Sequence, residues 1–185
     1  NETSTGCRSR IDEIRKALDA ANHPALLMVD TISSLACTDL RHDEWGIDVT
    51  VSGSQKGMML PPGLSFTAIS DKALAASKTA KLKRSYFSWD DMLANNANGF
   101  FPYTPATGLL YGLAEAIDMI NEEGLENVFT RHERLAEATR RAVRAWGREI
   151  QCRDPKIASP AVTTVIMPEG HNADAYRKIV LDNFN

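Results

Sequence analysis

Two residues of opposite charge follow two apolar runs in the first third of the chain. Asp30 ends the run Leu26-Leu27-Met28-Val29-Asp30, and Lys56 comes shortly after a β-rich run over residues 47–51. Short, continuous apolar runs of this kind predict buried strands of a parallel sheet. In such sheets ligands bind beyond the carboxyl ends of the strands, so we expect Asp30 and Lys56 to face the same crevice.

A lysine and an acid in one crevice fit the chemistry of pyridoxal 5'-phosphate. A lysine amine can hold the aldehyde of this cofactor as a Schiff base, and a carboxylate can pair with the pyridinium nitrogen. The pairing keeps the ring able to accept electrons from a carbanion at the substrate α-carbon, and the released lysine then carries the proton. The pattern alone leaves a second interpretation open, because acids at strand ends and lysines on solvated loops are common.

Several short stretches resemble one enzyme family. They are Val29-Asp30-Thr31-Ile32-Ser33-Ser34-Leu35, Ser52-Gly53-Ser54-Gln55-Lys56-Gly57, Pro61-Pro62-Gly63, the opening Asn1-Glu2-Thr3-Ser4-Thr5-Gly6, and Gly124-Leu125-Glu126-Asn127. In this order, across nearly the whole chain, they resemble the serine–glyoxylate and alanine–glyoxylate aminotransferases. These are class V, fold type I enzymes that use pyridoxal phosphate.

The resemblance implies an α/β fold and a division of the chain into two domains. A three-layer, mainly parallel sheet would form part of a large cofactor-binding domain over residues 1–123. Residues 124–185 would begin a smaller α+β domain, with the boundary at the helix-breaking Gly124.

The resemblance also implies roles for individual residues near the cofactor. It makes Lys56 the Schiff-base lysine and Asp30 the acid that pairs with the pyridine nitrogen. Thr3 would lie beside the ring hydroxyl, Ile32 would pack against one face of the ring, and Gln55 would bind the phosphate.

One further residue is implied to act across a subunit interface. In the family, the position of Thr104 reaches the phosphate of the neighbouring subunit of a homodimer, helped by an aromatic residue that is often Tyr. Here that aromatic position falls on Phe101, which has no hydroxyl. The residue types also predict that Thr104 caps a helix whose first turn contains Pro105, and a helix N-terminus is a ready anion site.

The expected activity is transamination between an amino acid, serine or alanine, and a 2-oxo acid, glyoxylate or pyruvate. One alternative is a related pyridoxal phosphate lyase such as a cysteine desulfurase. Those enzymes usually carry His before the lysine, where this chain has Gln55, and the three cysteines do not match the place of their mobile nucleophile: Cys7, Cys37 and Cys152. A second alternative is a non-catalytic remnant of the fold, against which the intact acid and lysine argue.

The composition excludes several other classes of protein. The chain has 185 residues, 43% hydrophobic and 24% charged, with a net charge of −3. This balance gives no nucleic-acid footprint, and no apolar run approaches the ~20 residues of a membrane helix. Three widely spaced cysteines fit neither a disulfide framework nor a zinc site, so we expect no metal and a reducing compartment. That compartment would be the cytoplasm in a bacterium, with the peroxisome and the mitochondrion as alternatives.

The sequence also looks like an internal piece of a longer protein. It begins without Met inside a motif and ends while an apolar pattern is still running. By the resemblance, the aromatic residue that stacks on the ring precedes Asn1, and the arginine that binds the substrate carboxylate follows Asn185. Within the chain, the periodicity predicts helices over 11–21, 73–83, 109–121 and 125–146, and a late strand over 162–167.

Overall fold

A computed structural model describes residues 1–184 of the chain, which form two compact units. One unit is Arg10–Val128, and the other joins Asn1–Ser9 to the part of the chain that begins at Phe129. This division into compact units does not test the domain boundary at Gly124, which stays a prediction.

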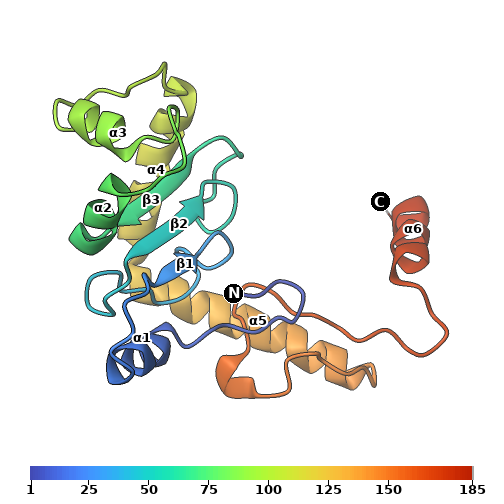
Figure 1. The fold of residues 1–185 in the computed structure, drawn as a ribbon. Helices are drawn as coiled ribbons and strands as arrows, with labels where there is room; N and C mark the ends of the chain where they lie inside the picture. Colours follow the sequence, from blue (N-terminus) through green and yellow to red (C-terminus); the bar gives the residue numbers. More distant parts are fainter. Residues whose placement is uncertain (185) are drawn as a thin grey trace. The chain divides into compact units, whose positions relative to one another are not determined.

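The unit Arg10–Val128 contains a three-stranded sheet in the order β1-β2-β3 (Figure 1). The strands are β1 (Met28–Asp30), β2 (Val49–Gly53) and β3 (Ser65–Ile69). β1 and β2 are parallel, with Asp30 opposite Val51, whereas β2 and β3 are antiparallel. The α/β prediction is confirmed, and the parallel pair brings the end of β1 and the end of β2 to the same edge of the sheet.

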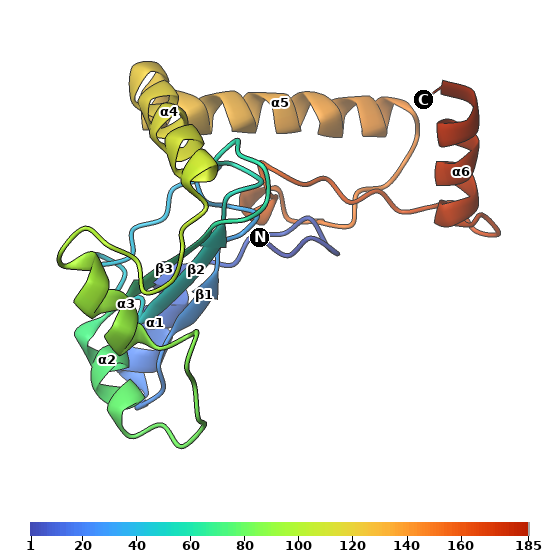
Figure 2. The same cartoon turned by 90° about the horizontal axis from the view of Figure 1, so that it is seen from above.

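This unit also contains helices. They are α1 (Ile11–Ala20), α2 (Asp71–Lys78), α3 (Trp89–Asn96) and α4 (Thr107–Glu123). Ile11 and Leu18 of α1 pack against a buried cluster of Leu27, Val29 and Ile47. Figure 2 shows α1 and α2 on one side of the sheet and α4 on the other, so the sheet is the middle layer.

The predicted start of α4 was wrong. Thr104 is not the N-cap: the helix begins at Thr107, Ala106 is its N-cap, and no side chain caps it. The physical reason is that the first helical hydrogen bond runs from Leu110 N to the Ala106 carbonyl, at 3.1 Å. Thr104 therefore precedes the N-cap of the helix, and its hydroxyl does not cap the first turn.

A buried carboxylate fixes the amino end of the sheet. Asp48, directly before β2, accepts hydrogen bonds from Leu27 N at 2.8 Å and Ser70 Oγ at 2.9 Å. Arg15 and Lys72 lie 3.6 and 3.7 Å from the same carboxylate. Burial raises the pKa of Asp48, but these hydrogen bonds and the two cations outweigh it, so the pKa lies below its usual value.

The other unit is dominated by α5 (Leu125–Ala145), which begins at the end of the first unit. The 3₁₀ turn η1 (Pro155–Ile157) and α6 (Ala173–Phe184) follow. The strand predicted over 162–167 was wrong, since that segment makes only an isolated bridge between Ile150 and Val165. Its β-branched residues favour an extended backbone, but two backbone hydrogen bonds to residues 149–151 do not make a ladder. No helix within residues 1–184 has both the length and the apolar composition required to cross a bilayer.

Candidate functional site

The turn after β1 holds Asp30 at the edge of the sheet. Asp30 is exposed, and its Oδ1 accepts a hydrogen bond from Ile32 N at 2.9 Å. Thr31 is buried, and both its backbone N and its Oγ1 donate to the Val51 carbonyl, at 2.8 and 3.0 Å. Ser52 Oγ of β2 donates in turn to the Thr31 carbonyl at 3.2 Å. These bonds to β2 fix the position of the backbone next to Asp30, and so the place from which its carboxylate extends.

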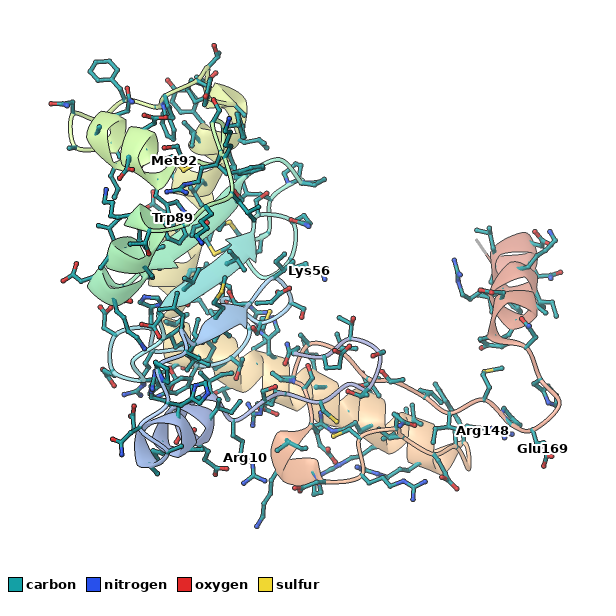
Figure 3. All side chains as sticks on the ribbon, in the orientation of Figure 1. Arg10, Lys56, Trp89, Met92, Arg148 and Glu169 are labelled. Atoms are coloured by element: carbon teal, nitrogen blue, oxygen red, sulfur yellow. The ribbon has the colours of Figure 1, made fainter. Side chains whose placement is uncertain are left out.

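A closed loop after β2 carries Lys56. The fully buried Ser54 closes this loop, because its Oγ donates to the Pro61 carbonyl at 2.8 Å and accepts from Leu64 N at 3.2 Å. The Lys56 carbonyl accepts from Met59 N at 2.8 Å. Lys56 itself is exposed, and Figure 3 shows its side chain projecting outward from the loop.

Gly57 brings the two loops into contact. A Cβ at this position would lie 2.0 Å from the Leu35 carbonyl oxygen and 2.8 Å from Cys37 Sγ, so only glycine fits. Two non-glycine residues in these loops, Ala36 and Met59, also have a positive φ of 60°. Such backbone strain of ~1–3 kcal/mol per residue gathers at functional sites, where the surrounding structure enforces it. Asp30 and Lys56 therefore lie on two adjoining, tightly constrained loops.

Helix α4 packs against the loop that carries Lys56. A Cβ on Gly63, which has a φ of 145°, would lie 2.5 Å from Leu109 Cδ1, and one on Gly112 would lie 2.9 Å from Leu60 Cδ2. The close approach fixes the start of α4 relative to the loop. Thr104 precedes this helix and is exposed.

The structure brings most of the predicted site residues into one unit. Asp30, the half-buried Ile32 and the exposed Gln55 and Lys56 lie on the two adjoining loops, and Thr104 belongs to the same unit. Thr3 belongs to the other unit, on a turn closed by a hydrogen bond from Glu2 N to the Cys7 carbonyl at 2.7 Å. The side chain of Thr3 is exposed, and its carbonyl accepts from Thr164 Oγ1 at 3.1 Å. The roles of all six residues stay predictions.

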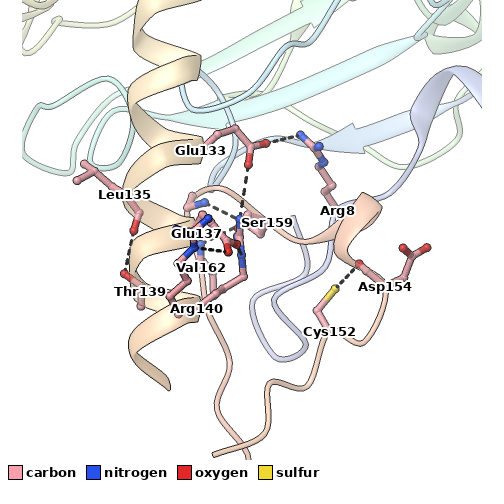
Figure 4. Close-up of polar contacts among 12 residues, drawn as sticks. Arg8, Glu133, Leu135, Glu137, Thr139, Arg140, Cys152, Asp154, Ser159 and Val162 are labelled. Atoms are coloured by element: carbon pink, nitrogen blue, oxygen red, sulfur yellow. Dashed lines mark hydrogen bonds and ion pairs between the residues drawn. The ribbon is translucent and has the colours of Figure 1, made fainter. Parts of the chain in front are cut away.

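Sequence reasoning missed a buried arginine in the same unit as Thr3. Arg140 of α5 is 8% exposed and donates from NH1 to the Ser159 carbonyl at 3.2 Å (Figure 4). Its Nε donates to Glu137 at 2.9 Å, and this bond and one from Arg141 lower the pKa of Glu137 to about 2. A signal was present, because the buried residues of this helix include Ala136, Arg140 and Val143 at the spacing of one helix face.

The donor set at the sheet edge fits pyridoxal phosphate. Within residues 1–184, Lys56 Nζ makes no hydrogen bond or ion pair, so its amine can reach an aldehyde without first breaking a contact. Asp30 supplies an exposed carboxylate at the same edge for a pyridine nitrogen. In the part of the chain that the structure describes, no group of three His, Cys, Asp or Glu residues is placed to hold a metal ion.

Comparison with known proteins points the same way. A family model described as "Aminotransferase class-V" matches residues 1–183. The serine–glyoxylate aminotransferase of Hyphomicrobium methylovorum is 51% identical, covering 100% of this chain and 46% of that protein. The L-aspartate–glyoxylate aminotransferase of Paracoccus denitrificans is 47% identical over 100% of this chain and 47% of its own.

A solved structure shares the fold. The crystal structure of the alanine–glyoxylate aminotransferase from Nostoc sp. superposes with a TM-score of 0.87 at 28% identity, covering 99% of this chain and 48% of that one. This chain therefore spans about half the length of the proteins that it matches.

Proposed function

Because the chain belongs to the class V aminotransferase family, we propose that the complete protein transfers an amino group between an amino acid and a 2-oxo acid with pyridoxal phosphate. The proposed pair is serine or alanine with glyoxylate or pyruvate, since relatives of this chain are named for glyoxylate transamination. The observation that carries the proposal is the contact at Gly57, which sets the loops of Asp30 and Lys56 side by side.

Lys56 is the proposed covalent anchor and proton carrier. When bound, the cofactor supplies an electron sink for the carbanion at the substrate α-carbon. Lys56 Nζ would hold the cofactor aldehyde between turnovers and, as a free amine during turnover, would carry the proton of the substrate α-carbon. Its exposed position in the loop after β2 supports both tasks.

Asp30 is the proposed partner of the pyridine nitrogen. Ile32 N donates to Oδ1 at 2.9 Å, which orients the carboxylate, and the carboxylate would stabilise a proton on the ring nitrogen. Ile32 itself is proposed to pack against one face of the ring. The bond between the Ile32 backbone and Asp30 would then couple the position of the ring to that of its acid.

The remaining residues are proposed to fix the ends of the cofactor. Gln55 would donate to the phosphate, and Thr3 would donate to the ring hydroxyl. Thr104 would reach the phosphate of the second subunit in a two-fold symmetric homodimer, so that each site borrows one Thr104 and lends one. The desulfurase alternative is not favoured, since Gln55 stands where those enzymes usually carry His and the relatives named above are aminotransferases.

Chemical trapping on the complete protein tests the role of Lys56. Borohydride reduction followed by peptide mapping should place a pyridoxyl group on Lys56, and Lys56→Ala should lose both the adduct and the turnover. Lys81→Ala, at another exposed lysine of the same unit, is the control and should keep both. An adduct on Lys72 or Lys78 with none on Lys56 would end the assignment.

Mixing two impaired variants tests the dimer. Chains carrying Lys56→Ala and chains carrying Thr104→Ala would form mixed dimers in which one site holds both lesions and the other holds neither. Activity should therefore rise when the two weak variants are mixed and exchanged. If mixed dimers form without any recovery, Thr104 does not act across the interface.

A further inference from the structure

We propose that Arg140 is a positioning residue for the cofactor contact of Thr3. This inference rests on the role of Thr3 in the proposed function and adds how that residue is held. All the contacts involved lie in the unit that joins Asn1–Ser9 to the chain from Phe129 onward. The path runs from Arg140 on α5 through Ser159 to the turn on which Thr3 lies.

Besides the bond from Glu2 N to the Cys7 carbonyl, a second backbone hydrogen bond closes the turn of Thr3. Gly6 N donates to the Glu2 carbonyl at 2.9 Å, and Gly6 has a positive φ of 67°. A Cβ on Gly6 would lie 3.1 Å from Thr164 N, so the turn also sits close against its neighbouring segment. Thr3 is exposed in this turn, where Thr164 Oγ1 holds its carbonyl at 3.1 Å, and the anchoring of the base of the turn also contributes to its position.

The base of the turn is anchored on a residue that Arg140 holds. Ser159 is fully buried, and its N donates to the Gly6 carbonyl at 2.8 Å. The carbonyl of the same Ser159 accepts from Arg140 NH1 at 3.2 Å. The peptide groups on the two sides of Ser159 thus link the turn to α5.

Ion pairs through Glu133 also connect Arg140 to Arg8, which follows the turn of Thr3. Arg8 NH1 lies 3.3 Å from Glu133 Oε1, and Glu133 Oε2 lies 3.8 Å from Arg140 NH2 (Figure 4). Arg8 N also donates to the Ile157 carbonyl at 2.8 Å, which keeps this end beside the segment that leads to Ser159. Both ends of the stretch from Gly6 to Arg8 therefore connect to one guanidinium.

The arrangement requires arginine in particular. Nε, NH1 and NH2 of Arg140 face three different acceptors, on Glu137, Ser159 and Glu133. A planar guanidinium presents these donors in fixed directions, whereas a lysine ammonium is a single point charge on a flexible stem. Arg140→Lys therefore keeps the positive charge but cannot hold the Ser159 carbonyl and both carboxylates at once.

A double-mutant cycle on the complete protein tests the inference, with pyridoxal phosphate affinity measured by absorbance titration of the cofactor-free protein. Thr3→Val should weaken binding by roughly tenfold, as expected for one hydrogen bond to a charged group. Arg140→Lys should weaken it by a similar factor, and the double variant should bind no more weakly than either single variant. Arg141→Lys is the matched control, because Arg141 also bonds Glu137 but is exposed, and it should leave the affinity within about twofold.

The outcomes separate the contact of Thr3 with the cofactor from the role of Arg140 in positioning Thr3. Losses that multiply in the double variant would show that Arg140 does not act through Thr3 and would overturn the inference, while the Thr3 contact would stand. An unchanged affinity in Thr3→Val would remove the contact from the proposed function and the inference with it.

Amide hydrogen exchange gives a readout that needs no cofactor. The Ser159 amide should exchange faster in Arg140→Lys and not in Arg141→Lys, and equal rates in the two variants would overturn the inference. If Arg140→Lys does not fold, Glu133→Gln replaces it in the affinity measurements, since it weakens the ion pair with Arg8 and leaves the bond from Arg140 to Ser159. It should give a smaller loss that does not multiply with Thr3→Val, and a multiplied loss would again overturn the inference.

Discussion

Backbone hydrogen bonds and a closely packed glycine support both the loop of Lys56 and the turn of Thr3, but the turn of Thr3 is also supported by charged side chains. Around Lys56, the contacts are backbone hydrogen bonds, the buried Ser54 hydroxyl and the steric fit of Gly57. Around Thr3, charged side chains of α5 reach the segment that supports the turn. Short-range sterics and neutral hydrogen bonds respond little to pH or salt, whereas ion pairs respond to both. The two regions should therefore fail under different conditions.

The largest expected effect is that of Gly57→Ala, which tests the steric half of the comparison. A methyl group 2.0 Å from the Leu35 carbonyl oxygen forces the two loops apart, because backbone atoms cannot yield as a flexible side chain does. We expect a loss of about 3 kcal/mol in the free energy of unfolding, at the upper end of overpacking effects. Denaturant unfolding of the complete protein, followed by a probe in the unit Arg10–Val128, measures it.

Gly108→Ala is the control for this prediction. Gly108 lies in α4 with no atom within 4 Å of its added Cβ, so alanine should stabilise the helix by ~0.5–1 kcal/mol. Opposite signs for the two substitutions would support the steric account. Equal, small effects would mean that the loops adjust freely and that Gly57 does not fix their separation.

The next largest effect should come from Asp48→Asn, which removes an ionic contact from the unit that also contains the loop of Lys56. An amide cannot accept from Leu27 N and Ser70 Oγ while also balancing Arg15 and Lys72, so we expect a loss of ~2 kcal/mol at neutral pH.

The sign of its pH dependence follows from the lowered pKa of Asp48. The stabilisation is present above the pKa of the unfolded chain and is lost as the pH falls through the lower pKa of the folded state. The difference between wild type and Asp48→Asn should therefore shrink in acid. A constant difference from neutral pH into acid would contradict this assignment.

Ser54→Ala should have a smaller effect that does not depend on pH. It leaves the Pro61 carbonyl and Leu64 N without their partner in a buried loop, at a cost of ~1–2 kcal/mol. None of the three groups titrates between neutral and acidic pH, so the difference from wild type in denaturant midpoint should be the same at both. A difference that varies with pH would mean that charges also hold the loop of Lys56.

Much of the Lys56 region was predictable because its pattern is local. The apolar runs before Asp30 and Lys56 correctly indicated two parallel strands that end at one edge. The contact of Gly57 with Leu35 was not predictable, since it joins separate loops whose approach depends on the whole sheet. The start of α4 was misplaced because Thr104-Pro105 fits a cap by residue type, while hydrogen bonding starts at Ala106.

Less of the Thr3 region was predictable, since its contacts span the length of the chain. The residues over 162–167 favour an extended backbone, but whether they form a strand depends on a partner far away in sequence. Arg140 was hidden among exposed arginines of the same helix, and only its spacing from Ala136 and Val143 marks it as buried. The motif at Asn1–Gly6 indicated a functional turn without indicating what supports it.

The smallest effect at neutral pH, and the sharpest test of the ionic half, is that of Glu137→Gln. Glu137 is bonded by Arg140 and Arg141, which lower its pKa from 4.5 to about 2, and such exposed contacts contribute little at neutral pH. Because the pKa of the folded state is the lower one, the stabilisation is present above about 4.5 and is lost as the pH falls toward about 2. Wild type should therefore lose more stability than Glu137→Gln over this window, and the protection factor of its Ser159 amide, which corrects for the intrinsic pH dependence of exchange, should fall more steeply. Ser54→Ala, measured alongside, should lose the same stability as wild type over this window.

If Glu137→Gln also loses the same stability as wild type down to pH ~2, the charges of α5 do not hold the turn of Thr3, and the contrast between the two regions disappears.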